Sequence, residues 1–194
     1  MLARRLARPA GPLIWLREEA VERRLALHAP GLAALGLDPG RLVLGAMPDA
    51  LAVLRAGVEA LRCGDVALVV IEIWHQPAIL DLTATRRLAL AAERSGVTPL
   101  LLRIAARPMP SAAHTRWDVT PALSRPLVDD APGHPALAAR LARHRGGRAG
   151  MDWRMEWDRD TGSFRAAALS GAVPSLSGDR PAAVIRPGPW RRVG

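Results

Sequence analysis

The chain has 194 residues, a formal net charge of +9 and a hydrophobic content of 49%. This length allows one globular domain with a real core, and the composition excludes a disordered chain. Because no apolar stretch approaches the roughly 20 residues that span a bilayer, the pattern excludes a membrane protein. The apolar patch Leu13 to Leu16 is too short for the core of a signal peptide, so we expect a cytoplasmic protein.

The basic residues are unusual in kind, since all 27 Lys and Arg residues are arginines. A pI near 11.5 favours contact with polyanions or with acidic protein surfaces. Chemistry that needs a lysine ammonium is excluded from this chain. The single cysteine, Cys63, excludes an internal disulfide and a cysteine metal cluster, and we interpret it as a small buried hydrophobe.

Apolar runs that predict buried strands alternate with amphipathic stretches that predict helices up to residue 105. Continuous apolar strands in such an alternation indicate an α/β fold with a parallel sheet covered on both faces. In chain order, we expect a strand at 11–16, a helix at 17–37 broken at Pro30-Gly31, and a strand at 41–46. A helix at 48–64 follows, with Pro48 at its first position and Asp49 at the positive end of its dipole. A strand from Val66 to Glu72, a helix at 81–96 capped by Asp81 and a strand at 98–105 complete this part of the chain.

The pattern changes after Arg107, where a loop leads to a predicted strand with Trp117 and Val119 on one face. A hairpin follows later, because apolar and charged residues alternate from Met151 to Asp158 before a turn at 160–162. The stretch 136–145 fits either a helix or one arm of a hairpin. We therefore divide the chain into a core at 1–123, a linker at 124–135, an antiparallel β-hairpin extension of the sheet at 136–170, and a flexible basic tail at 171–194.

Several segments together resemble the ImuA family, the RecA-like accessory proteins of the bacterial damage-induced mutagenesis cassette. They are GPLIWLREE (11–19), APGLAALGLDPGRLVL (29–44), PDALAVLRAGVEALRCGDVALVVIE (48–72), LDLTATRRLALAAERSGVTPLLLR (80–103) and PSAAHTRWDV (110–119). The resemblance runs from about Leu2 to the hairpin near Trp157. It implies a RecA-like three-layer sandwich with a mostly parallel sheet and antiparallel C-terminal strands.

The same resemblance implies partners and a pathway. These are an ImuB-like protein related to the Y-family polymerases and an error-prone C-family polymerase, acting in translesion synthesis during the SOS response. In RecA-like folds a strand, a phosphate-binding loop and a helix precede the segment that opens this chain. Residues 1–10 resemble the end of that helix, so we expect the strand and the loop to be missing from this sequence or Met1 to be an internal start.

Glu72 ends a predicted strand, at the position that the RecA-like resemblance assigns to a magnesium-binding acid. Glu18 and Glu19 follow the first strand, where RecA-like ATPases place the glutamate that activates water. A phosphate-binding loop needs a G-x-x-x-x-G-K-[ST] motif with its lysine, and this chain has none. We therefore expect Glu72 to be a degenerate acid, and the other two to be first-turn acids that favour a helix start.

The five histidines are scattered without metal-binding spacing, so we expect no metal and no cofactor. The basic clusters are better candidates for binding, because arginine beside an exposed aromatic residue can hold DNA or a protein partner. A solvated basic surface explains them equally well. The clusters comprise Arg140, Arg143, Arg145 and Arg148 around a Gly-Gly turn, and Trp190, Arg191 and Arg192 in the tail.

The favoured hypothesis is a non-enzymatic adaptor of an error-prone polymerase complex, binding an ImuB-like protein, with RecA and DNA as further candidates. One alternative is a SulA-like inhibitor of cell division, and another is an active RecA-type ATPase. The sequence leaves the oligomeric state, the directness of each contact and DNA binding open.

Overall fold

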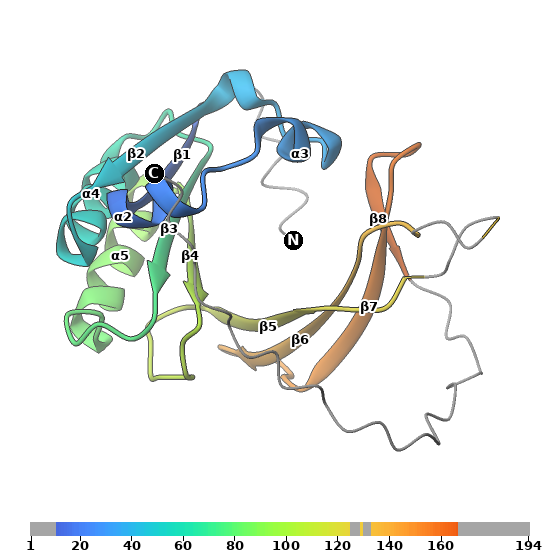
Figure 1. Cartoon of the computed structure of the whole chain (residues 1–194). Coiled ribbons are helices and arrows are strands. Elements are labelled where there is room, and N and C mark those ends of the chain that lie inside the picture. Colours follow the sequence, from blue (N-terminus) through green and yellow to red (C-terminus); the bar gives the residue numbers. More distant parts are fainter. Residues whose placement is uncertain (1–10, 125–128, 130–132, 167–194) are drawn as a thin grey trace, which may run out of the picture.

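The computed structural model describes residues 11–124, 129 and 133–166. The described residues form two four-stranded sheets, one parallel and one antiparallel (Figure 1). Parts of the predicted linker, the end of the predicted hairpin at 167–170 and the tail at 171–194 lie outside these ranges.

The parallel sheet has the strand order β2-β1-β3-β4. Its strands are β1 (Leu13–Glu18), β2 (Leu42–Met47), β3 (Leu68–Trp74) and β4 (Thr98–Ile104). Each was expected from an apolar run, and the parallel pairing confirms the predicted α/β pattern. The carboxyl ends of the parallel strands therefore share one edge of the sheet.

The helices also follow the predicted pattern. The expectation that the helix breaks at Pro30-Gly31 was wrong. The interruption lies at 25–28, between α2 (Glu19–Arg24) and α3 (Ala29–Ala34), and Pro30 occupies the first turn of α3, where its missing N–H costs no hydrogen bond. A 3-10 turn, η1 (Pro39–Arg41), leads into β2.

The two long helices, α4 (Ala50–Arg62) and α5 (Leu82–Ser95), are both capped by an aspartate side chain. Asp81 accepts a hydrogen bond from the Ala84 N–H, as expected. The expectation that Pro48 begins α4 was wrong by two residues. The Asp49 carboxylate accepts the Ala52 N–H and makes Asp49 the N-cap, so the helix starts at Ala50.

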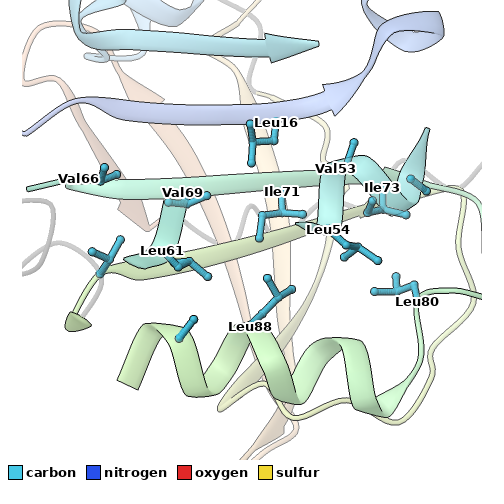
Figure 2. Close-up of a cluster of buried hydrophobic side chains, with 13 residues drawn as sticks. Leu16, Val53, Leu54, Leu61, Val66, Val69, Ile71, Ile73, Leu80 and Leu88 are labelled. Carbon is cyan, nitrogen blue, oxygen red and sulfur yellow. The ribbon is translucent and has the colours of Figure 1, made fainter. Parts of the chain in front are cut away.

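The core lies between the parallel sheet and the helices α4 and α5 (Figure 2). Alternate residues of β3 point into it, and Val69, Ile71 and Ile73 are fully buried. Leu61 of α4 and Leu88 of α5 pack from the helical side. Burying a large aliphatic side chain contributes about 1.5–3 kcal/mol, so this layer is the main source of stability.

Cys63 was expected to be buried, and this expectation was wrong, because its side chain is exposed. The helix α4 ends at Arg62, and Cys63 is the C-cap with extended backbone angles. Cys63 therefore does not lie on the buried apolar face of α4, to which Leu61 belongs.

The antiparallel sheet contains β5 (Thr115–Pro121), β6 (Ala136–His144), β7 (Met151–Asp158) and β8 (Ser163–Ala166), in that order. The stretch that fitted either a helix or a strand is β6. The expected extension of the parallel sheet differs from the structure, since β6 pairs with β5 and β7 and the four strands form a sheet of their own. Figure 1 shows this sheet curving away from the foot of the parallel sheet.

One indole joins the end of the antiparallel sheet to the N-terminal half of the chain. Trp157 of β7 is 6% exposed, and its Nε1 donates to the Ala34 carbonyl at 2.9 Å. Trp157 also packs against Phe164 with ring centroids 4.9 Å apart. Trp153 of the same strand is 37% exposed and lies beside Trp117, with ring centroids 5.1 Å apart.

None of the helices in the described ranges is both long and apolar enough to cross a bilayer.

Candidate functional site

Glu72 lies near the carboxyl end of β3 and is 2% exposed. Successive side chains of a strand point to opposite faces of the sheet, and its neighbours Ile71 and Ile73 enter the core. Glu72 therefore projects from the opposite face, away from α4 and α5. A buried carboxylate in this position needs hydrogen-bond partners, because leaving it unpaired costs several kcal/mol.

Three side chains satisfy the carboxylate. Arg17 Nη2 donates to Glu72 Oε1 at 2.8 Å, and the Trp74 indole donates to the same oxygen at 2.6 Å. The Trp15 indole donates to Oε2 at 2.8 Å. Both carboxylate oxygens thus accept strong donors from two neighbouring strands.

Arg17 is itself buried, at 3% exposed, and it is held from the far side as well. Its Nη1 donates to Glu22 Oε2 and to the Leu25 carbonyl, each at 2.9 Å. Arg17 therefore bridges two acids, one on β3 and one on α2. The group that faces Glu72 is a fixed positive charge.

This arrangement does not fit a magnesium ion. Mg²⁺ needs free carboxylate oxygens, near-octahedral geometry and several retained waters. At Glu72 both oxygens are engaged, and a divalent cation would have to lie beside the Arg17 guanidinium. We name the set Trp15, Arg17, Glu72 and Trp74 the sealed carboxylate.

The structure does not bring Glu18 and Glu19 to the sealed carboxylate. Glu18 follows Arg17 on β1 and so points to the other face of the sheet. Glu19 is in the first turn of α2 and pairs with Arg23 at 3.3 Å, with both side chains mostly exposed. Glu19 agrees with the interpretation as a first-turn acid, whereas Glu18 is the N-cap residue of α2 and its side chain makes no cap hydrogen bond.

Two residues at the carboxyl edge adopt backbone angles that are uncommon for side-chain-bearing residues. His75 after β3 has φ 57° and Ala105 after β4 has φ 51°. The His75 N–H donates to the Ile104 carbonyl at 2.8 Å, which ties the two strand ends together. Such left-handed residues cost about 1–2 kcal/mol each and are frequent next to functional sites.

The structure separates the four arginines predicted around the Gly-Gly turn. Arg140 projects from β6 toward Asp152 of β7, with Nε 3.9 Å from the carboxylate. Arg143 is in register with Arg116 of β5 and donates to the Ser111 carbonyl at 2.7 Å. Both Arg145 and Arg148 are exposed beyond the end of β6.

The predicted contacts Trp190, Arg191 and Arg192 lie outside the described residues. Within the described ranges no three His, Cys, Asp or Glu side chains gather as a metal site would require.

Sequence reasoning found Glu72 but missed Arg17, Trp15 and Trp74 as its partners. A signal was present, because Trp15 and Arg17 are two residues apart on β1, as are Glu72 and Trp74 on β3. Residues spaced by two share a face of a strand. What the sequence does not give is that β1 and β3 are neighbours with Trp15 opposite Val70.

The comparisons with known proteins agree with this architecture. No protein-family model matches the chain. Over 154 residues it is 37% identical to proteins named ImuA from two strains of Caulobacter vibrioides, and the alignment covers 74% of this chain. The chain spans 59% of the length of these curated relatives.

Among solved structures, the chain is similar to the crystal structure of the RadB recombinase, with a TM-score of 0.51 at 13% identity. This match covers 77% of the chain and 76% of RadB, and it confirms the predicted RecA-like fold. A match to SulA from Pseudomonas aeruginosa covers 55% of the chain and 82% of SulA at 26% identity, with a TM-score of 0.40.

Proposed function

Because this chain is homologous to the ImuA proteins over 154 residues, we propose that it is a non-catalytic RecA-like adaptor of an error-prone DNA synthesis complex. In this proposal the chain works in the cytoplasm and joins the nucleoid at damaged DNA during the SOS response. Its direct partner is an ImuB-like protein, and RecA, an error-prone C-family polymerase and DNA are further candidates.

The sealed carboxylate is the observation that supports a non-catalytic role. A RecA-like ATPase needs an acid at the end of this strand that is free to orient Mg²⁺ and its bound triphosphate. Here Arg17 supplies the positive charge in place of a metal, and both oxygens of Glu72 are engaged. The acid thus stabilises the fold and is not available to a nucleotide.

Titration calorimetry tests this directly. We expect no heat of binding when ATP with Mg²⁺, or Mg²⁺ alone, is titrated into the chain. The variant Glu72→Gln should give the same flat trace, because an engaged carboxylate contributes nothing to metal binding. Saturable binding of Mg·ATP that is lost in Glu72→Gln would overturn the non-catalytic role.

Partner binding needs a separate test, by co-expression with the ImuB-like protein encoded in the same genome. We expect the full chain to retain this protein on an affinity column, and a variant lacking residues 171–194 to retain less. That variant should keep its melting temperature nearly unchanged, because the core lies in β1 to β4 and the long helices. Failure to retain either the ImuB-like protein or RecA would count against the adaptor role. Cell filamentation on overexpression would instead favour an inhibitor of cell division.

A further inference from the structure

Three arginines from three strands reach the loop that connects β4 to β5. Arg103 of β4 is in register with Ile73, whose side chain enters the core on the face of the parallel sheet opposite Glu72. Arg116 of β5 and Arg143 of β6 are opposite each other in the antiparallel sheet. We name Arg103, Arg116 and Arg143 the arginine cluster.

All three side chains donate to the loop that connects β4 to β5. Their acceptors are neutral oxygens, so the hydrogen bonds hold the loop but leave the positive charges uncompensated. The contacts are Arg103 Nη1 to the Arg107 carbonyl at 2.9 Å, Arg116 Nη2 to the Met109 carbonyl and, at 3.5 Å, to Ser111 Oγ, and Arg143 Nη1 to the Ser111 carbonyl at 2.7 Å.

The cluster has no carboxylate to balance it in the described part of the chain. None of its three members forms an ion pair there, although Arg17, Arg23, Arg62, Arg140 and Arg165 each do. Partial burial and the neighbouring Arg116 both lower the pKa of Arg103. The Arg103 and Arg116 guanidinium groups are therefore close enough to repel each other.

Arg103 also holds donors that nothing in the described residues accepts. Its Nε and Nη2 are enclosed and have no hydrogen-bond partner. A buried charged donor without an acceptor lowers the stability of the folded state, and native proteins retain few such groups. Holding a loop needs donors only, so the loop contacts do not explain why three positive charges are gathered here.

We propose that the arginine cluster is a binding site for a phosphate group. Phosphate presents several acceptor oxygens and a full negative charge, which suits more than one guanidinium fork at once. Arg143 is exposed and Arg116 is partly exposed, so these two contact the phosphate, while Arg103 adds charge from beneath. The phosphate belongs either to a small molecule or to a nucleic-acid backbone. The inference does not depend on the adaptor role.

Binding assays on the full chain test the proposal with three probes at low salt. These are inorganic phosphate, a fluorescein-labelled single-stranded thymidine 15-mer and a hexaglutamate peptide. The informative variant is Arg143→Gln, because its exposed side chain can be changed without disturbing the core. The matched control is Arg159→Gln, which removes the same charge from the exposed turn at the other end of β7.

We expect Arg143→Gln to weaken phosphate or oligonucleotide binding about tenfold, in line with the loss of one charge-assisted hydrogen bond. The control should change affinity by less than about twofold, because only long-range attraction is reduced and salt screens it. Arg103→Gln should also weaken binding, because it removes the charge beneath the phosphate. Its melting temperature should change little, since the loss of the hydrogen bond to the Arg107 carbonyl is offset by removal of enclosed donors that have no acceptor in the described residues.

The probes separate the sources of the phosphate. Binding of the 15-mer but not of inorganic phosphate, with the same dependence on Arg143, assigns the site to a nucleic-acid backbone. Binding of inorganic phosphate as well assigns it to a small phosphate. Equal weakening by Arg143→Gln and Arg159→Gln, or binding of hexaglutamate alone, would overturn the proposal.

Discussion

At the scale of residues, the Arg17–Glu72 pair decides what the carboxyl edge of the sheet can do. Both side chains are nearly fully buried, at 3% and 2% exposed. Burying an ion pair often gains little over a well-packed apolar pair, because desolvation offsets the attraction. Removing one partner is different, since the other charge is then left in a site that water cannot reach.

A double-mutant cycle measures this coupling. We expect Arg17→Met and Glu72→Gln each to lower the free energy of unfolding by about 3–5 kcal/mol. The double variant should lose less than the sum, because no buried charge remains, although the glutamine has one oxygen and accepts from only one of the Trp15 and Trp74 indoles. Urea unfolding gives the four values.

The exposed pair Arg62–Glu59 serves as the control for this cycle, since its side chains are 64% and 67% exposed. Arg62→Met should cost less than about 1 kcal/mol. Additive effects at Arg17 and Glu72 would show that the two residues are not coupled.

At the scale of elements, the loop after β4 begins with a residue in an unfavourable backbone conformation. Ala105 has φ 51° and is exposed, so only its backbone is constrained. We expect Ala105→Gly to raise the free energy of unfolding by about 0.5–1 kcal/mol, because glycine adopts a left-handed conformation without the steric penalty. Thermal and urea unfolding measure this change.

The neighbouring Ala106, which is not in the left-handed region, is the matched control. Ala106→Gly should lower stability slightly, since it only adds freedom to the unfolded chain. A loss of stability in both variants would mean that the left-handed conformation of Ala105 carries no strain.

The β7–β8 hairpin contains a pH-sensitive carboxylate. Burial is the largest single effect and raises the pKa of Asp158, but the hydrogen bonds from Thr161 and Asp160 and the charge of Arg165 together outweigh it and lower the pKa overall. Because the pKa of Asp158 is lowered in the folded state, its ionised carboxylate stabilises the fold fully above the ordinary Asp pKa of about 3.9. This stabilisation is lost as the pH falls through the lowered pKa.

We therefore expect amide-exchange protection in the 159–162 turn to decrease only in this acidic range. Asp158→Asn should make the protection independent of pH there. An unchanged pH profile in the variant would show that another group controls the hairpin.

Several elements could be predicted because their signals are local. The alternation from Met151 to Asp158 and the turn at Gly162 gave the hairpin, and Asp81 gave the start of α5. The strand β6 could not be assigned, because Ala and Leu favour a helix and only pairing with β5 and β7 makes this stretch extended. The sealed carboxylate and the arginine cluster could not be predicted for the same reason. Each joins side chains from strands that are distant in the chain, and the sequence does not show which strands are neighbours.

At the scale of the whole molecule, two of the links between the sheets in the described ranges lie at opposite ends of the second sheet. The loop from 105 to 114 joins them along the chain, and Trp157 joins the far end of the second sheet to Ala34. Figure 1 shows the antiparallel sheet curving from the end of β4 toward α3. The relative position of the sheets therefore depends on one buried indole as well as on the connecting loop.

We expect Trp157→Phe to lower the free energy of unfolding by about 1 kcal/mol, because the hydrogen bond to Ala34 is lost while the ring still packs on Phe164. Trp153→Phe is the control, since Trp153 is 37% exposed and its indole N–H has no partner in the described ranges. Equal effects of the two substitutions on urea unfolding would show that the link to Ala34 contributes nothing.

The sealed carboxylate also constrains how this chain can change over generations. Metal binding at Glu72 would need its carboxylate to be released from Arg17. Replacing Arg17 alone leaves the Glu72 charge buried without its counter-ion, so we expect the loss of stability to precede any gain of metal affinity. Two changes made together, one at Arg17 and one that restores stability elsewhere, are therefore needed before this position is available to a cation.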